Sequence, residues 1–103
     1  MLKPNPVRIF EKTSSEAIDW DEDFTDMLES GESISSVSAS AVDSSGTSAS
    51  SVIGTASYSG TIVTVLLQAG TNMTEYRVTL SATSGSHVYS KVAILRIRNI
   101  PVI

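Results

Sequence analysis

Apolar and polar side chains alternate without a break between residues 76 and 83. The residues of one parity are aromatic or aliphatic: Tyr76, Val78, Leu80 and Ala82. The residues of the other parity are polar: Arg77, Thr79, Ser81 and Thr83. Successive side chains of a β-strand point to opposite faces of the sheet, so this pattern predicts a strand with one buried and one solvated face. The chain must therefore build a sheet that covers a core.

Four more segments fit the same architecture. Residues 61–68 are apolar on both faces, which predicts a central strand. After a turn at residues 84–86, residues 87–98 form a last long strand. In the serine-rich stretch 33–59, small apolar residues alternate with serine around Ala39, and residues 51–58 favour a weaker strand.

The resulting fold class is all-β. We expect a β-sandwich of about seven strands, because turn signals recur at roughly 8–12 residues, and its connectivity should be Ig-like or fibronectin III-like. Residues 14–103 are expected to form this single domain. Residues 1–13 are expected to form an extended N-terminal arm, because Pro4 and Pro6 cannot donate to a strand ladder. Such an arm could reach a neighbouring subunit or could end in a short edge strand.

One short helix is expected near the N-terminus, at roughly residues 20–29. Four large side chains follow helical spacing and are Trp20, Phe24, Met27 and Leu28. Acidic residues in the first turn favour the positive end of a helix, and Gly31 supplies a stop.

The composition argues against several classes of partner. The net charge is −4 and cysteine is absent, so we expect no nucleic acid, which requires clustered basic residues, and no cysteine chemistry. No apolar run is long enough to span a bilayer and no signal peptide opens the chain, so we expect no membrane partner.

Catalytic groups are sparse as well. His87 is the only histidine, and neither a nucleophile elbow nor a phosphate-binding loop is present. A calcium loop that began at Asp21 would place Asp26 where a sharp turn requires glycine. We therefore expect no enzyme activity, no catalytic residue, no metal site and no cofactor.

Charge is distributed unevenly along the chain. Residues 16–32 contain eight acidic residues and no basic one, whereas residues 76–103 contain basic residues and no acidic one. Either the two segments lie side by side in one domain, or copies of the chain pack acidic face against basic face in a symmetric ring.

Val92 and Ile94 share the outer parity of the last strand with Arg96 and Arg98, which favours a protein partner. The candidate interface comprises the N-terminal arm, this strand and the acidic segment, namely Pro4, Pro6, Phe10, Asp21, Glu22, Asp26, Val92, Ile94, Arg96 and Arg98.

Two stretches carry a family resemblance. The first is Ile18-Asp19-Trp20 with Phe24, Leu28, Gly31-Glu32 and Ile34, and the second comprises residues 63–71 and 76–85. Together they resemble the small Ig-like structural proteins of tailed bacteriophages. The double glycine of that family is Ala69-Gly70 here.

This resemblance implies a non-enzymatic virion protein, an adaptor in the neck, tail or fibre-attachment region. It would be assembled in the host cytoplasm in several copies and would contact other virion proteins. Two alternatives remain open: a capsid decoration protein, and a carbohydrate- or cell-surface-binding module that uses Tyr58 and Tyr89.

Overall fold

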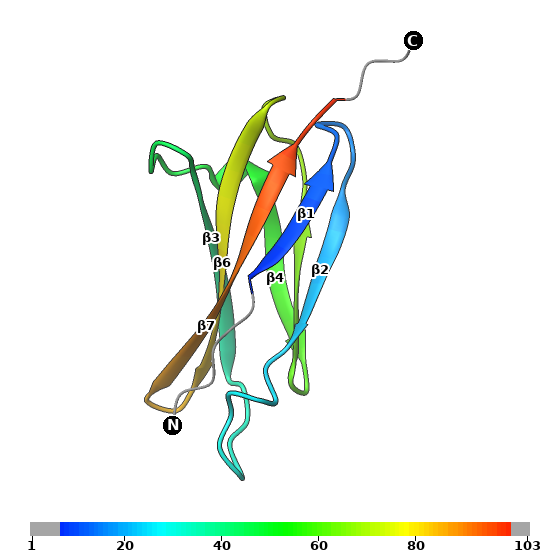
Figure 1. Ribbon diagram of the computed structural model, residues 1–103. Coiled ribbons are helices and arrows are strands. Elements are labelled where there is room, and N and C mark those ends of the chain that lie inside the picture. Colours follow the sequence, from blue (N-terminus) through cyan, green and yellow to red (C-terminus); the bar gives the residue numbers. More distant parts are fainter. Residues whose placement is uncertain (1–6, 100–103) are drawn as a thin grey trace.

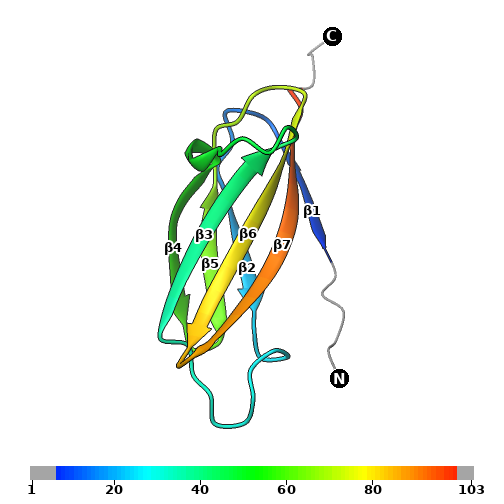
Figure 2. The same ribbon diagram turned by 90° about the vertical axis from the view of Figure 1, so that its left-hand side faces the viewer.

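The computed structural model describes residues 7–99, which form two packed β-sheets (Figure 1). The elements in chain order are β1 (Arg8–Lys12), β2 (Ile18–Asp23), β3 (Ser36–Asp43), the 3₁₀ turn η1 (Ser50–Val52), β4 (Ile53–Ser59), β5 (Ile62–Leu67), β6 (Thr74–Ser84) and β7 (His87–Ile97). The four-stranded sheet has the order β1-β7-β6-β3, and the three-stranded sheet has the order β2-β5-β4. Figure 2 shows β3, β6 and β7 in front of the three-stranded sheet.

The core lies between the inner faces of the two sheets. In β6 and β7 it takes every second residue, including Val78, Leu80 and Leu95, none of which has accessible surface. Val65 of β5 faces them from the other sheet and is also fully buried. The alternation of residues 76–83 and the central position of the 61–68 strand are therefore confirmed, because β5 lies between β2 and β4.

The helix predicted over residues 20–29 is wrong. Trp20 lies in β2 and pairs with Val65 of β5. Only one turn follows the strand, in which the N–H groups of Met27 and Leu28 donate to the carbonyl of Phe24 at 2.9 and 3.2 Å. In β2 the acidic residues alternate with Trp20, so the strand buries the indole and keeps Asp19 and its acidic neighbours exposed.

The N-terminal segment joins the domain as an edge strand. β1 runs parallel to β7, with Phe10 opposite Leu95, and the N–H of Arg98 donates to the carbonyl of Lys12 at 2.9 Å. Of the two alternatives for the predicted arm, residues 8–12 therefore form the short edge strand. Pro4 and Pro6 lie outside the described residues.

The turn between β5 and β6 closes one end of the sandwich. The Thr71 N–H donates to the Tyr76 hydroxyl at 2.9 Å, and the Met73 N–H donates to the Ile97 carbonyl at 2.7 Å. The Lys12 side chain, only 3% exposed, donates from Nζ to the carbonyl of Ala69 at 2.6 Å, and burial lowers its pKa. Over residues 7–99, no helix has the length and apolar character that a membrane span requires.

Candidate protein-interaction surface

An apolar stripe crosses the solvent-facing side of the four-stranded sheet, which we call the outer face. It begins on β1 with Ile9, which lies opposite Ile94 of β7 and is 59% exposed. It continues along β7 through half-buried Val92 and, beyond Ser90, ends at Val88, which is 63% exposed. Because inner-face residues of β7 such as Leu95 fill the core, these outward residues contribute nothing to core packing.

Hydroxyl side chains occupy most of the rest of the outer face. The outward hydroxyl positions of β3 and β6 beside the stripe are Ser36, Ser38, Ser40, Thr79, Ser81 and Thr83. Thr79 lies opposite Val92, so the hydroxyl-rich region directly adjoins the apolar stripe. Arg77 of β6 is exposed on the same face, directly opposite Ile94. A surface of apolar and hydroxyl groups with a single arginine costs less to desolvate than a densely charged one, and arginine is enriched at protein interfaces.

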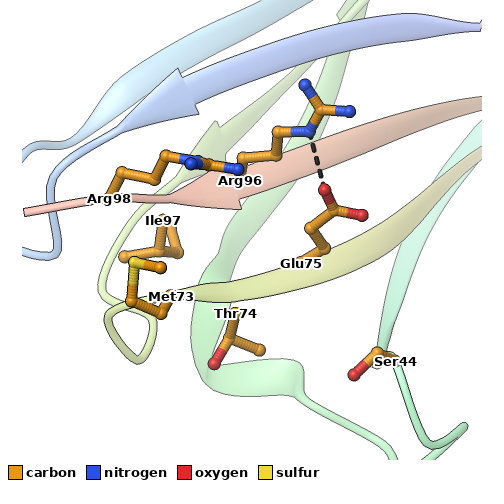
Figure 3. Close-up of a pocket in the computed structure, with 7 residues that line it drawn as sticks. All are labelled: Ser44, Met73, Thr74, Glu75, Arg96, Ile97 and Arg98. Carbon is orange, nitrogen blue, oxygen red and sulfur yellow. Dashed lines mark hydrogen bonds and ion pairs between the residues drawn. The ribbon is translucent and has the colours of Figure 1, made fainter.

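Charged residues gather at one end of the outer face, around a shallow hollow (Figure 3). Arg96 of β7 and Glu75 of β6 point toward one another across it, with Nε and Oε2 2.7 Å apart. Arg98 lies 3.5 Å from Glu11 of β1. The hollow has a volume of about 290 Å³ and is lined by Ser44, Met73, Thr74, Glu75, Arg96, Ile97 and Arg98.

Four of the candidate interface residues predicted from sequence therefore share one surface. Val92, Ile94 and Arg96 lie on the outer face of β7, and Arg98 follows directly after the strand. Phe10 is directed inward, and its ring centroid lies 6.0 Å from that of Trp20.

The acidic candidates lie elsewhere, along β2 and the loop that follows it. Asp21 and Asp26 are exposed, and Asp21 accepts a hydrogen bond of 2.7 Å from the Thr64 hydroxyl. Glu22 is partly buried and joins the two sheets, because its carboxylate lies 2.9 Å from Arg8 and 3.4 Å from Lys91. Lys91 thus brings part of the acidic segment next to the last strand within one domain, whereas Arg96 and Arg98 pair with Glu75 and Glu11.

Three groups hold the Glu22 carboxylate in its charged form. The indole Nε1 of Trp20 donates to its Oε1 at 3.0 Å. Partial burial alone would raise the pKa of Glu22, but the hydrogen bond from Trp20 and the charges of Lys91 and Arg8 hold that pKa below its ordinary value. Glu22 therefore acts as a fixed structural contact between the sheets.

A second cluster, which the sequence analysis did not single out, ties the loop after β2 to the β6–β7 hairpin. Glu32 accepts hydrogen bonds from the Tyr89 hydroxyl at 2.7 Å and from the Glu29 N–H at 2.7 Å, and it lies 2.9 Å from His87 Nδ1. The hydrogen bonds from Glu29, His87 and Tyr89 lower the pKa of Glu32 to about 2. No signal in the sequence points to this cluster, since 55 residues separate Glu32 from His87.

This cluster also contains the side chains best placed to hold a metal ion. Ligand atoms of Glu29, Glu32 and His87 lie within 4.8 Å of one another. A metal ion bound there would have to displace the hydrogen bonds that His87 and Tyr89 make to Glu32.

The single histidine offers a direct measurement on this cluster. The hydrogen bond and negative charge of Glu32 raise the pKa of His87 above its ordinary value of 6.5. Imidazole NMR titration should give a value above 6.5 for the wild type and a lower one for Glu32→Gln. A Glu29→Gln variant, which leaves the hydrogen bond intact, should shift the His87 pKa less. Equal values in the wild type and Glu32→Gln would contradict the contact.

The same shifts fix the pH window of this ion pair. A raised His87 pKa means that its contribution to stability is complete below pH 6.5 and declines as the pH rises through the folded-state value. A lowered Glu32 pKa means that its contribution is complete above pH 4.5 and is lost as the pH falls toward 2. The pair should therefore stabilise the loop most between these limits.

Comparison with known proteins agrees with a protein-interaction surface. No curated protein sequence and no solved structure matches the chain. The sequence profile of the family described as podophage GP4 fiber-tail adaptor protein gp77 matches residues 12–94, most of the chain. This match confirms the adaptor function inferred from the sequence resemblance and makes the chain part of a virion, where it contacts other virion proteins. The chain belongs to the Gp77 family of podophage fibre–tail adaptor proteins.

Proposed function

We propose that this adaptor joins a fibre to the tail by binding another virion protein through its outer face, and that it has no enzymatic activity. The observation that carries the proposal is the apolar stripe from Ile9 through Ile94 and Val92 to Val88. Large apolar residues gathered on an exposed sheet face mark protein contact sites, and the hydroxyl-rich surroundings complete such a patch. Arg96 and Arg98 form its charged rim.

We infer that the scaffold is an Ig-like sandwich. An Ig domain places its second, fifth and fourth strands in one sheet and its third, sixth and seventh strands in the other. The sheets β2-β5-β4 and β3-β6-β7 have the same membership, with β1 added beside β7. This agreement supports the inference.

The proposal extends to the remaining candidate residues. Asp21 and Asp26 are exposed and take part in no ion pair among residues 7–99, so they are available for contacts with neighbouring copies. Pro4 and Pro6 would contribute through the segment ahead of β1, and Glu22 and Phe10 would support β1 from within. Assembly would take place in the host cytoplasm, in several copies and without nucleic acid as a partner.

Of the two alternatives, a capsid decoration protein is not favoured by the fibre–tail family. A carbohydrate-binding module would need exposed aromatic faces. Tyr89 is half-buried and bonded to Glu32, and Tyr58 donates its hydroxyl to the Ser35 carbonyl at 3.1 Å. Only Tyr58, which is 42% exposed, offers a ring face to solvent, and a single ring does not make the aromatic platform of such a module.

A matched pair of substitutions tests the contact face. Ile94→Glu places a charge in the middle of the outer face, whereas Ile62→Glu makes the same change on the outward side of β5 in the other sheet. Binding to purified tail and fibre proteins should weaken by about tenfold or more for Ile94→Glu, because a charge would be buried in the interface. Ile62→Glu should bind as the wild type does.

The readout is biolayer interferometry with each virion protein, together with thermal unfolding to establish that both variants fold. Equal affinities of the wild type and Ile94→Glu for every partner would refute the proposed contact face.

A further inference from the structure

The two sheets expose four edge strands, and three of them carry features that prevent pairing with another strand. β1 is short and charged, and β2 carries four acidic residues. β4 has a register shift between Ile53 and Ala56. Short length, charge and bulges are the ways in which proteins protect sheet edges.

Within residues 7–99, β3 is the one edge that lacks these features. The turn at residues 47–49 covers its end at residues 41–43, which leaves residues 36–40 open. β3 pairs with β6 in unbroken register from Ser36 to Asp43 and contains neither proline nor a charged residue before Asp43. Its position at the border of the four-stranded sheet is visible in Figure 2. A regular, uncharged edge is a template for another strand.

The unpaired backbone groups of this edge can be located from the neighbouring turn. The carbonyl of Ala41 accepts from Ala49 at 2.9 Å, and the N–H of Asp43 donates to Thr47 at 2.9 Å, so odd-numbered residues direct their backbone groups away from β6. By the alternation of a strand, Val37 and Ala39 direct their N–H and C=O groups the same way. Their side chains pack against the core. Their backbone N–H and C=O groups lie in the plane of the sheet and point away from β6, toward the open edge.

Charge indicates which strand fits there. The chain carries a net charge of −4, so two copies repel over most of their surfaces. Residues 33–74 contain a single charged residue, Asp43, and they include both β3 and the adjacent edge strand β4 of the other sheet. The side of the sandwich formed by these two strands is therefore where two copies approach with least repulsion.

We propose that the β3 edge pairs with the β3 edge of a second copy, antiparallel about a twofold axis at Ser38. This register places Val37 opposite Ala39 of the second copy and forms about four main-chain hydrogen bonds. Serine rows meet on the outer face and Val and Ala rows meet on the inner face, so the surface is self-complementary, as a twofold interface requires. The four-stranded sheets of the two copies become one continuous sheet, a contact separate from the apolar stripe.

The test is the self-association of the purified full chain by analytical ultracentrifugation over a wide concentration range. Ser38→Lys places two ammonium groups directly across the twofold axis, so it should weaken dimerisation by about tenfold or more. Ser81→Lys is the matched control, because Ser81 is the register partner of Ser38 on the same face but lies on an interior strand. It should dimerise as the wild type does.

Hydrogen exchange supplies a second measurement that needs no variant. The amides of Val37 and Ala39 should become more protected as the wild-type concentration rises, while the amide of exposed Thr25 should not change. A wild-type chain that stays monomeric, or an equal loss of dimer in both lysine variants, overturns the proposal. The proposal is also overturned if the Val37 and Ala39 amides become protected only when a tail or fibre protein is added, because that protein would then be the one that pairs with the β3 edge. None of these results bears on the Ile94→Glu test of the outer face.

Discussion

Trp20→Ala is expected to lower the free energy of unfolding by about 3–5 kcal/mol, the range for truncating a buried large aromatic side chain. The indole is 1% exposed and packs in the core against Phe10. Its removal would leave a cavity and would also deprive Glu22 of the hydrogen bond from Nε1. The contact between the two sheets at the β1–β2 side would therefore weaken together with the core.

Urea unfolding followed by circular dichroism measures this loss, since the variant lacks the chain's only tryptophan. Trp20→Phe, which keeps an aromatic ring but loses the N–H donor, should lie between the wild type and Trp20→Ala. Asp19→Ala is the control in the same strand, and an exposed position of this kind should change stability by less than about 0.5 kcal/mol. A Trp20→Ala protein within about 1 kcal/mol of the wild type would place Trp20 outside the core.

Gly70→Ala is expected to cost about 3 kcal/mol, because backbone strain and a steric clash act at the same position. Gly70 has φ +100, and an added Cβ would lie 2.6 Å from Cγ1 and 2.8 Å from Cδ1 of Ile97. Ile97 is fully buried in the core, so a shift of its side chain would disturb the packing of its core neighbours. The turn between β5 and β6 would have to shift away from β7.

Gly46→Ala isolates the strain from the clash. Gly46 has φ +87, close to that of Gly70, but no atom lies within 4 Å of the position of its Cβ. This variant should lose only about 1–2 kcal/mol, the cost of a left-handed conformation for an alanine. Thermal and urea unfolding of the two variants under identical conditions gives the comparison. Equal losses would show that the approach of Ile97 does not limit this turn.

The strands of the second half of the chain could be predicted because one periodicity determines them. In β6, and in β7 from Ala93 onward, every inward residue is apolar or small, so alternation alone identified both strands and their buried faces. β3 was also predictable, although its side chains are small, because Val37, Ala39 and Ala41 kept the same parity. Side-chain periodicity is a local property, and the sequence displays it directly.

The segment around Trp20 shows where local patterns are insufficient. Trp20 and Phe24 are both buried, so helical spacing and strand alternation followed by a turn explain the same side chains equally well. Pairing with β5 decided between them, and that pairing joins residues more than 40 positions apart. Tertiary context overrides local propensity at such positions.

The contacts of the charged groups were equally inaccessible to sequence reasoning. Lys91 bonds to Glu22, which lies 69 positions away, and Lys12 is buried against the carbonyl of Ala69. Sequence showed correctly that acidic and basic residues are segregated, but only the packing of β1 beside β2 and β7 shows which of them pair within the chain. It was the outward parity of Val92 and Ile94 that located the candidate contact face.

Cryo-electron microscopy of the intact phage tail tests the central claim most directly. We predict that the sandwich lies at the junction of fibre and tail, with Ile94 and Val92 of the outer face covered by another virion protein. A reconstruction in which the outer face is open to solvent, or in which the chain lies on the capsid, would contradict the account.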